Sequence, residues 1–107
     1  MTHALERRGS PRQALRTEAK LLFGDVLLLD ARTLDYSDSG MAILTDGPIA
    51  TGTQFSLRCY VPVAAARQEL VAQVRAVRSV YSREEAGFTT GVAFVEGEPV
   101  RRRAVGM

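Results

Sequence analysis

The chain has 107 residues, which is enough for one compact domain. Hydrophobic residues make up 46% of it and charged residues 24%, the balance of a soluble globular protein, and a formal net charge of +2 does not indicate a general nucleic-acid binder. Cys59 is the only cysteine and His3 the only histidine, so the sequence offers no intramolecular disulfide, thiolate metal site or histidine-based acid–base pair. We therefore expect a binding protein without a cofactor or metal, not an enzyme.

No apolar run approaches the length that a membrane-spanning helix needs. The N-terminal residues MTHALERRGSPRQ are polar and basic, and they lack the apolar stretch of a secretory signal. We expect a cytoplasmic protein that makes no contact with membranes.

Residues 1–13 form an irregular basic arm in which Gly9, Ser10 and Pro11 break any helix. Residues 1–20 hold five positive side chains against two negative ones, and thirteen of the fourteen cations in the chain are arginine. The planar fork of arginine binds phosphates and guanine edges through paired hydrogen bonds. Because the arm has few apolar anchors before Leu15, we expect it to be flexible.

The pattern that follows the arm predicts short strands. Two apolar runs between Leu15 and Leu34 flank Gly24-Asp25, a pair typical of a two-residue hairpin turn. The polar cluster of residues 35–40 ends the second strand, and Met41–Leu44 forms another. Thr53–Val61 alternates as a half-buried strand does, with Cys59 on its apolar side as a core residue.

Residues 63–85 fit two structures. Leu70, Val74, Val77 and Tyr81 fall at helical spacing, but the β-branched residues also suit two strands joined by a loop. Gly87–Val95 predicts a final strand, and the last dozen residues carry one or two helical turns at most. Five or six short strands joined by Gly, Pro and Asp turns indicate a small antiparallel barrel or sandwich.

Two motifs carry functional information. Arg8 and Arg12 form R-x-x-x-R, which is weak evidence alone because one or two such pairs are expected by chance with arginine at about one residue in eight. Arg12 and Arg16 form a second such pair. Asp35, Ser37 and Gly40 form D-x-S-x-x-G, for which this composition predicts roughly 0.02 chance occurrences. The structural alternative is a turn that caps itself through its own side-chain oxygens.

The order of these segments resembles the PilZ family. The matching segments are E-R-R-G-S-P-R, L-D-Y-S-D-S-G-M-A-I, a strand ending in Val61-Pro62, L-V-A-Q-V-R-A-V, and G-V-A-F at residues 91–94. The resemblance implies an all-β fold, a six-stranded antiparallel β-barrel, and it favours strand over helix at residues 69–81. It divides the chain into a flexible arm at 1–13, a barrel at 14–97 and a short basic tail at 98–107, with at most a short C-terminal helix.

The resemblance also implies a ligand, the signalling dinucleotide cyclic di-GMP. Arg8 and Arg12 would bind its phosphates and guanines, and Asp35, Ser37 and Gly40 would form the barrel side of the pocket. The chemistry suits these roles, because a carboxylate accepts hydrogens from the Watson–Crick edge of guanine and arginine pairs with its O6 and N7. Gly40 would permit a positive φ and a close approach of the backbone.

The arm and the tail have further expected roles. In the family, an arginine at the position of Arg7 resembles members that take two stacked ligands, although Arg7 also fits a solvated side chain. Ligand would fold the arm onto residues 35–40 and so expose or hide a site for a protein partner. Alternation turns Tyr36 toward the core, and Arg101–Arg103 are expected to be a solvated tail.

Two other functions fit the sequence less well. A degenerate PilZ adaptor would bind only protein partners, but such members are expected to have lost the arginines. A small barrel that binds single-stranded nucleic acid needs aromatic stacking platforms, and this chain has seven aromatic residues and no tryptophan. No residue selects the downstream pathway among motility, polysaccharide (biofilm) and pilus systems.

Overall fold

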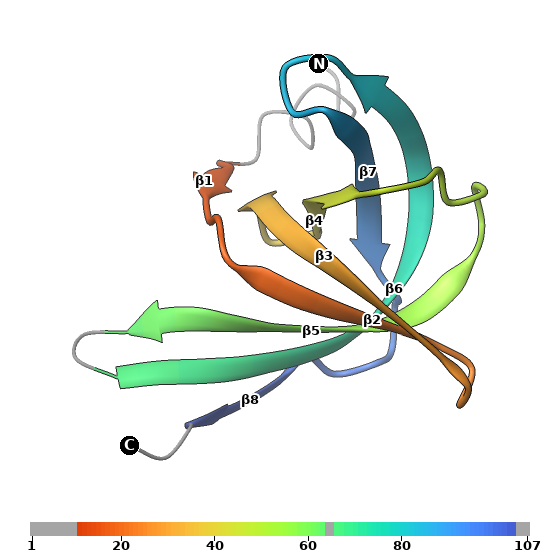
Figure 1. Ribbon diagram of the computed structural model, residues 1–107. Helices are drawn as coiled ribbons and strands as arrows, with labels where there is room; N and C mark the ends of the chain where they lie inside the picture. The colour runs from red at the N-terminus through yellow and green to blue at the C-terminus, as the bar shows by residue number, and fades with distance from the viewer. Residues whose placement is uncertain (1–10, 64–65, 105–107) are drawn as a thin grey trace, which may run out of the picture.

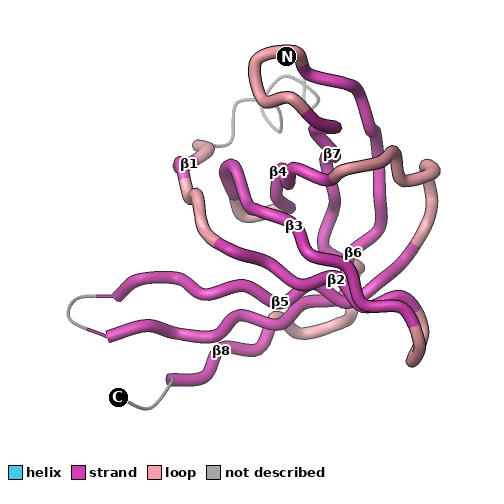
Figure 2. Tube along the Cα trace, in the orientation of Figure 1, coloured by secondary structure: helices cyan, strands magenta, loops and turns pink. Residues whose placement is uncertain are grey.

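A computed structural model describes residues 11–63 and 66–104, and all regular structure in this part of the chain is β-strand (Figures 1 and 2). The strands are β1 (Gln13–Ala14), β2 (Glu18–Phe23), β3 (Leu27–Tyr36), β4 (Gly40–Thr45), β5 (Gln54–Val63), β6 (Ala66–Ser82), β7 (Gly87–Phe94) and β8 (Arg101–Ala104). Every pairing between them is antiparallel. The predicted all-β class is confirmed.

Six of the strands close into a ring. Their order is β3-β2-β5-β6-β7-β4, and β4 pairs back onto β3. Two short strands lie outside this ring: β1 pairs with β3, and β8 pairs with β6. The predicted arrangement of six antiparallel strands is therefore confirmed, with two additional short strands that the sequence did not reveal.

The first hairpin joins β2 to β3. Its last pair is Phe23 with Leu27, so the loop contains the three residues 24–26 and not the predicted two. Gly24 has a φ of 63°, in the left-handed region that glycine enters without steric cost. The turn residues were identified correctly, but the loop is one residue longer because Val26 stays outside the ladder.

The disputed segment at residues 69–81 is strand. It belongs to β6, which pairs with β5 along one part of its length and with β7 along another. The helical spacing of its apolar residues is therefore coincidental, and its β-branched content is the better guide. The two ladders overlap at Val74 and Arg75, and the ladder to β7 has a register shift between Ala76 and Arg78.

The inward-facing side chains form one apolar core. Its most buried members are Leu21, Met41, Ile43, Leu57, Cys59 and Val74. Burial raises the pKa of the Cys59 thiol to about 11, so this side chain is protonated at neutral pH. The interpretation of Cys59 as a core residue is confirmed.

The C-terminal segment differs from its prediction. Residues 101–104 form β8 and not a helical turn, with Arg103 opposite Glu69 in the ladder to β6. The reason is that the first half of β6 presents an edge with unpaired backbone groups, which an extended segment satisfies. The segment that was assigned to a tail at 98–107 is thus attached to the sheet through β8.

Within the described ranges, no helix could span a membrane, and no group of three or more His, Cys, Asp or Glu residues could hold a metal ion.

Gly40 brings the backbone of β4 close to that of β7. A Cβ atom on this residue would lie 2.0 Å from the backbone oxygen of Val92, a distance that no side chain tolerates. Its φ is not in the left-handed region, so the expected positive φ is wrong. Gly40 is needed for the close backbone approach, and the neighbour it approaches is β7.

We therefore predict that Gly40→Ala lowers the free energy of unfolding by about 1–3 kcal/mol or more, because the added methyl overpacks the contact between two backbones. Urea unfolding followed by circular dichroism measures this change. Gly47→Ala is the matched control: a Cβ at Gly47 meets nothing within 4 Å, so its effect should stay within about 0.5 kcal/mol. Equal stability of the two variants would contradict the prediction.

Candidate functional site

A β-bulge in β3 sets the direction of the motif residues. Thr33 pairs with Ile43 and Asp35 with Ala42, so Leu34 is an extra residue in the ladder. Thr33 and its partner face the interior, and simple alternation would turn Asp35 inward as well. The extra residue reverses this: Asp35 lies outside with Ala42, while Tyr36 packs against the core. Tyr36 therefore faces inward as expected, but because of the extra residue and not because of simple alternation.

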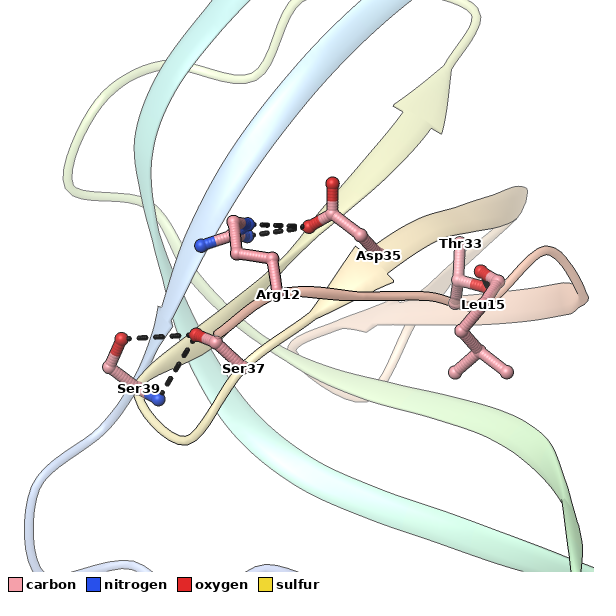
Figure 3. Close-up of polar contacts among 6 residues, drawn as sticks. All are labelled: Arg12, Leu15, Thr33, Asp35, Ser37 and Ser39. Atoms are coloured by element: carbon pink, nitrogen blue, oxygen red, sulfur yellow. Dashed lines mark hydrogen bonds and ion pairs between the residues drawn. The ribbon is translucent and has the colours of Figure 1, made fainter. Parts of the chain in front are cut away.

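The short strand β1 places Arg12 beside Asp35. Ala14 pairs with Asp35 and Gln13 with Tyr36, whose hydroxyl donates to Gln13 Oε1 at 2.8 Å. Arg12 donates from Nε to Asp35 Oδ1 at 2.8 Å, and a second guanidinium nitrogen lies 2.7 Å from the same oxygen (Figure 3). The two side chains are 46% and 33% exposed. The fold therefore joins the arginine motif to the aspartate motif at a surface that a ligand can reach.

The turn at residues 37–40 is held by its own atoms. The Ser37 N–H donates to the carbonyl oxygen of Gly40 at 2.9 Å, and the Ser39 N–H donates to Ser37 Oγ at 3.3 Å. The two serine hydroxyls lie 3.3 Å apart, and Ser37 is only 6% exposed (Figure 3). The serine part of the self-capping turn that served as the structural alternative is thus present, whereas the carboxylate of Asp35 contacts Arg12. Ser37 shapes the turn beside Asp35, whether or not a ligand also contacts its hydroxyl.

The two overlapping R-x-x-x-R pairs separate in the structure. Arg16 forms a bidentate pair with Glu85 in the loop between β6 and β7, with distances of 3.2 and 2.8 Å. The hydrogen bond raises the pKa of Arg16 and lowers that of Glu85. Arg12 contacts Asp35 instead, so Arg12 and not Arg16 belongs to the candidate site. Arg7 and Arg8, the other predicted ligand contacts, lie outside the described residues.

A pocket of about 320 Å³ lies beside the same turn. Tyr36, Ser37 and Asp38 border it, Met41 and Phe94 belong to its apolar wall, and Arg102 of β8 reaches its rim; the other lining residues are Leu15, Val61, Gln68, Leu70 and Val100. Sequence reasoning missed Asp38 as a pocket residue. It also missed Arg102, because residues 101–103 were expected to form a solvated tail. Residues 101–103 are exposed, as expected, but they belong to β8 and not to a free tail: Arg102 lines the pocket, and Arg103 pairs with Glu69 at 2.9 Å.

Sequence reasoning also missed Thr33, whose side chain holds residues 15–17, shortly after Arg12, against β3. Its buried hydroxyl donates to the carbonyl oxygen of Leu15, which lies beside it in Figure 3. The same hydroxyl accepts from the Thr17 N–H at 3.0 Å. Backbone hydrogen bonds from Leu15 to Leu34 and from Thr33 to Thr17 act in the same place. These bonds hold residues 15–17 against β3. The preceding residues, which include Arg12 and β1, are therefore anchored at their C-terminal end. A threonine in an apolar strand gave no signal of this role.

We predict that Thr33→Val lowers the free energy of unfolding by about 1–3 kcal/mol, because it leaves the Leu15 carbonyl and the Thr17 N–H unpaired in a buried place. Thr33→Ser retains the hydroxyl and should be destabilised less than the valine variant, although valine keeps more of the side-chain volume. Urea unfolding of both variants tests the order. A valine variant at least as stable as the serine variant would show that the hydroxyl does not tether the segment.

Comparison with known proteins identifies the family. The PilZ domain profile matches residues 6–106, nearly the whole chain. Among solved structures, the Bacillus subtilis inhibitor of motility MotI/DgrA superimposes with a TM-score of 0.72 at 12% sequence identity, over 84% of this chain and 43% of that one. This chain thus spans less than half of that structure, and the likeness concerns the fold. No curated protein matches significantly. The chain belongs to the PilZ domain family.

Proposed function

We propose that this PilZ domain is a receptor that binds cyclic di-GMP between its N-terminal arm and the turn of residues 35–40, without chemistry on the ligand. The observation that carries the proposal is the contact between Arg12 and Asp35, since it joins the two motifs that the family resemblance assigns to the ligand. Arg7, Arg8, Arg12, Asp35, Ser37 and Gly40 are the proposed site.

The Arg12–Asp35 pair has properties that suit a ligand site. Both contacts go to Oδ1 of Asp35, so Oδ2 and the remaining guanidinium donors can serve a ligand. Half-exposed ion pairs contribute only about 0–1 kcal/mol, so rearranging this one costs little. Arg12 can then bind a phosphate or the O6 and N7 atoms of guanine, while Asp35 accepts hydrogens from the guanine base.

We further propose that the bound state is read by a protein partner. A domain of 107 residues without catalytic parts can transmit a signal most directly through a surface. The neighbour MotI/DgrA is described as an inhibitor of motility, which makes motility one output to test. A ligand-free PilZ adaptor is the second candidate, favoured by the self-capping geometry of the turn, which needs no ligand to hold it.

Calorimetric titration with cyclic di-GMP tests the receptor function. We expect the wild type to bind and Arg12→Ala to bind about ten- to a hundredfold more weakly, the cost of one bidentate arginine contact. Arg16→Ala is the matched control, because it removes an arginine of the overlapping motif that is engaged with Glu85. The stoichiometry, one ligand or two, tests the role of Arg7.

Two outcomes would contradict the receptor function. Absence of binding by a folded wild type would favour the adaptor, and an equal loss in the Arg12 and Arg16 variants would place the ligand elsewhere. Oligonucleotide binding with a steep salt dependence would instead support the nucleic-acid alternative.

Hydrogen exchange tests whether ligand orders the arm. If ligand closes residues 4–16 onto the turn of residues 35–40, amide exchange in this segment should slow on adding cyclic di-GMP. Exchange in residues 54–57, the part of β5 that does not line the pocket, should not change and serves as the internal reference. Unchanged exchange in residues 4–16 at saturating ligand would rule out the arm as the moving part.

A further inference from the structure

The hairpin between β2 and β3 ends in an unusual run of exposed aliphatic side chains. Val26 is 90% exposed, Leu27 52%, Leu28 58% and Leu29 40%. Figure 1 shows this hairpin projecting away from the ring. Successive residues of a strand point to opposite faces, so aliphatic side chains are exposed on both faces of the tip. Such a cluster is costly to leave in water and indicates a contact surface.

A row of five aligned residues, four of them charged, crosses the sheet next to this tip. The ladder aligns Asp30 of β3, Lys20 of β2, Arg58 of β5, Val71 of β6 and Arg101 of β8. Their neighbours Ala19, Leu21, Leu57 and Cys59 are buried, so the row lies on the outer face. On that same face, Leu22 and Leu28 form the adjacent pair toward the tip. The apolar tip and the charged row are therefore parts of one surface, which we call the outer face.

The outer face is predominantly positive. Seven of its side chains are basic and three are acidic, a net charge of +4; the basic ones are Lys20, Arg32, Arg58, Arg67, Arg75, Arg101 and Arg103, and the acidic ones are Glu18, Asp30 and Glu69. Glu69 is nearly buried and holds Arg58 at 3.3 Å and Arg103 at 2.9 Å. Glu69 thus orients two of the arginines before any partner arrives.

We propose that the outer face docks an acidic, amphipathic segment of a partner protein, with aliphatic side chains against Val26 and Leu28 and carboxylates against Arg58 and Arg101. This inference rests on the proposed function, for which it names the chemistry of the partner. The five aligned strands span about 19 Å, the length of a helix of about 13 residues.

A synthetic peptide is the probe. We would label an amphipathic peptide of about 14 residues, with leucine on one face and glutamate flanking it, and measure its binding by fluorescence anisotropy. We expect binding that weakens with salt, and that weakens about tenfold or more in Val26→Ser/Leu28→Ser and in Arg101→Glu. Because Val26 and Arg101 are exposed, these variants should remain folded.

Matched controls come from the hairpin between β6 and β7. Val80→Ser removes an aliphatic side chain that is 46% exposed, and Arg83→Glu reverses an exposed charge; neither should alter binding. The proposal is overturned if the peptide does not bind, if the controls weaken it equally, if a scrambled peptide binds as well, or if anionic vesicles bind through the tip instead. Concentration-dependent dimerisation that the Val26/Leu28 variant abolishes would also overturn it, in favour of a second copy as occupant.

The same variants separate this inference from the receptor function. Leu28 lies seven residues along β3 from Asp35, about 23 Å at strand spacing, so the tip variants should titrate cyclic di-GMP as the wild type does. Peptide binding without cyclic di-GMP binding would refute the receptor and retain the docking face. The reverse result would retain the receptor and refute the docking face.

Discussion

The extra residue Leu34 in β3 is the constraint on which the candidate site depends. Without it, the alternation that buries Thr33 would also bury Asp35 and turn Tyr36 outward. With it, one short segment supplies a buried hydroxyl that tethers residues 15–17, an outward carboxylate that meets Arg12, and an aromatic side chain that packs on the core. Bulges commonly redirect side chains in this way next to functional sites.

The site combines fixed and exchangeable parts. Thr33 and the paired backbone around it are buried, so breaking their hydrogen bonds leaves unsatisfied groups and costs about 1–3 kcal/mol. The Arg12–Asp35 pair is half exposed, and such pairs contribute about 0–1 kcal/mol. The chain is thus anchored at Leu15, while the contact three residues earlier can rearrange. That difference in cost is what a ligand site needs if binding is to move the arm and leave the ring intact.

The sequence predicted those features that depend on local chemistry. Gly24-Asp25 marked the first hairpin, alternation from Phe55 to Cys59 marked a strand and its core face, and the family resemblance correctly chose strand at residues 69–81 where spacing allowed helix. It did not predict features that depend on a distant partner. Leu34 is apolar in an apolar strand, so nothing marks it as the bulge. Gly40 is required by the backbone of Val92, and β8 forms because β6 offers an edge; both partners are remote in sequence.

Strand β3 carries the candidate ligand site at one end and the apolar tip at the other. Residues 27–32 pair with β2, and residues 32–36 pair with β4, so the strand is held in a ladder along its whole length. A strand held in this way resists bending, because any change would break several hydrogen bonds at once. If both surfaces function as proposed, a signal between them therefore does not travel as a distortion of β3. A partner on the outer face would then sense cyclic di-GMP by contacting the bound ligand itself at the Asp35 end.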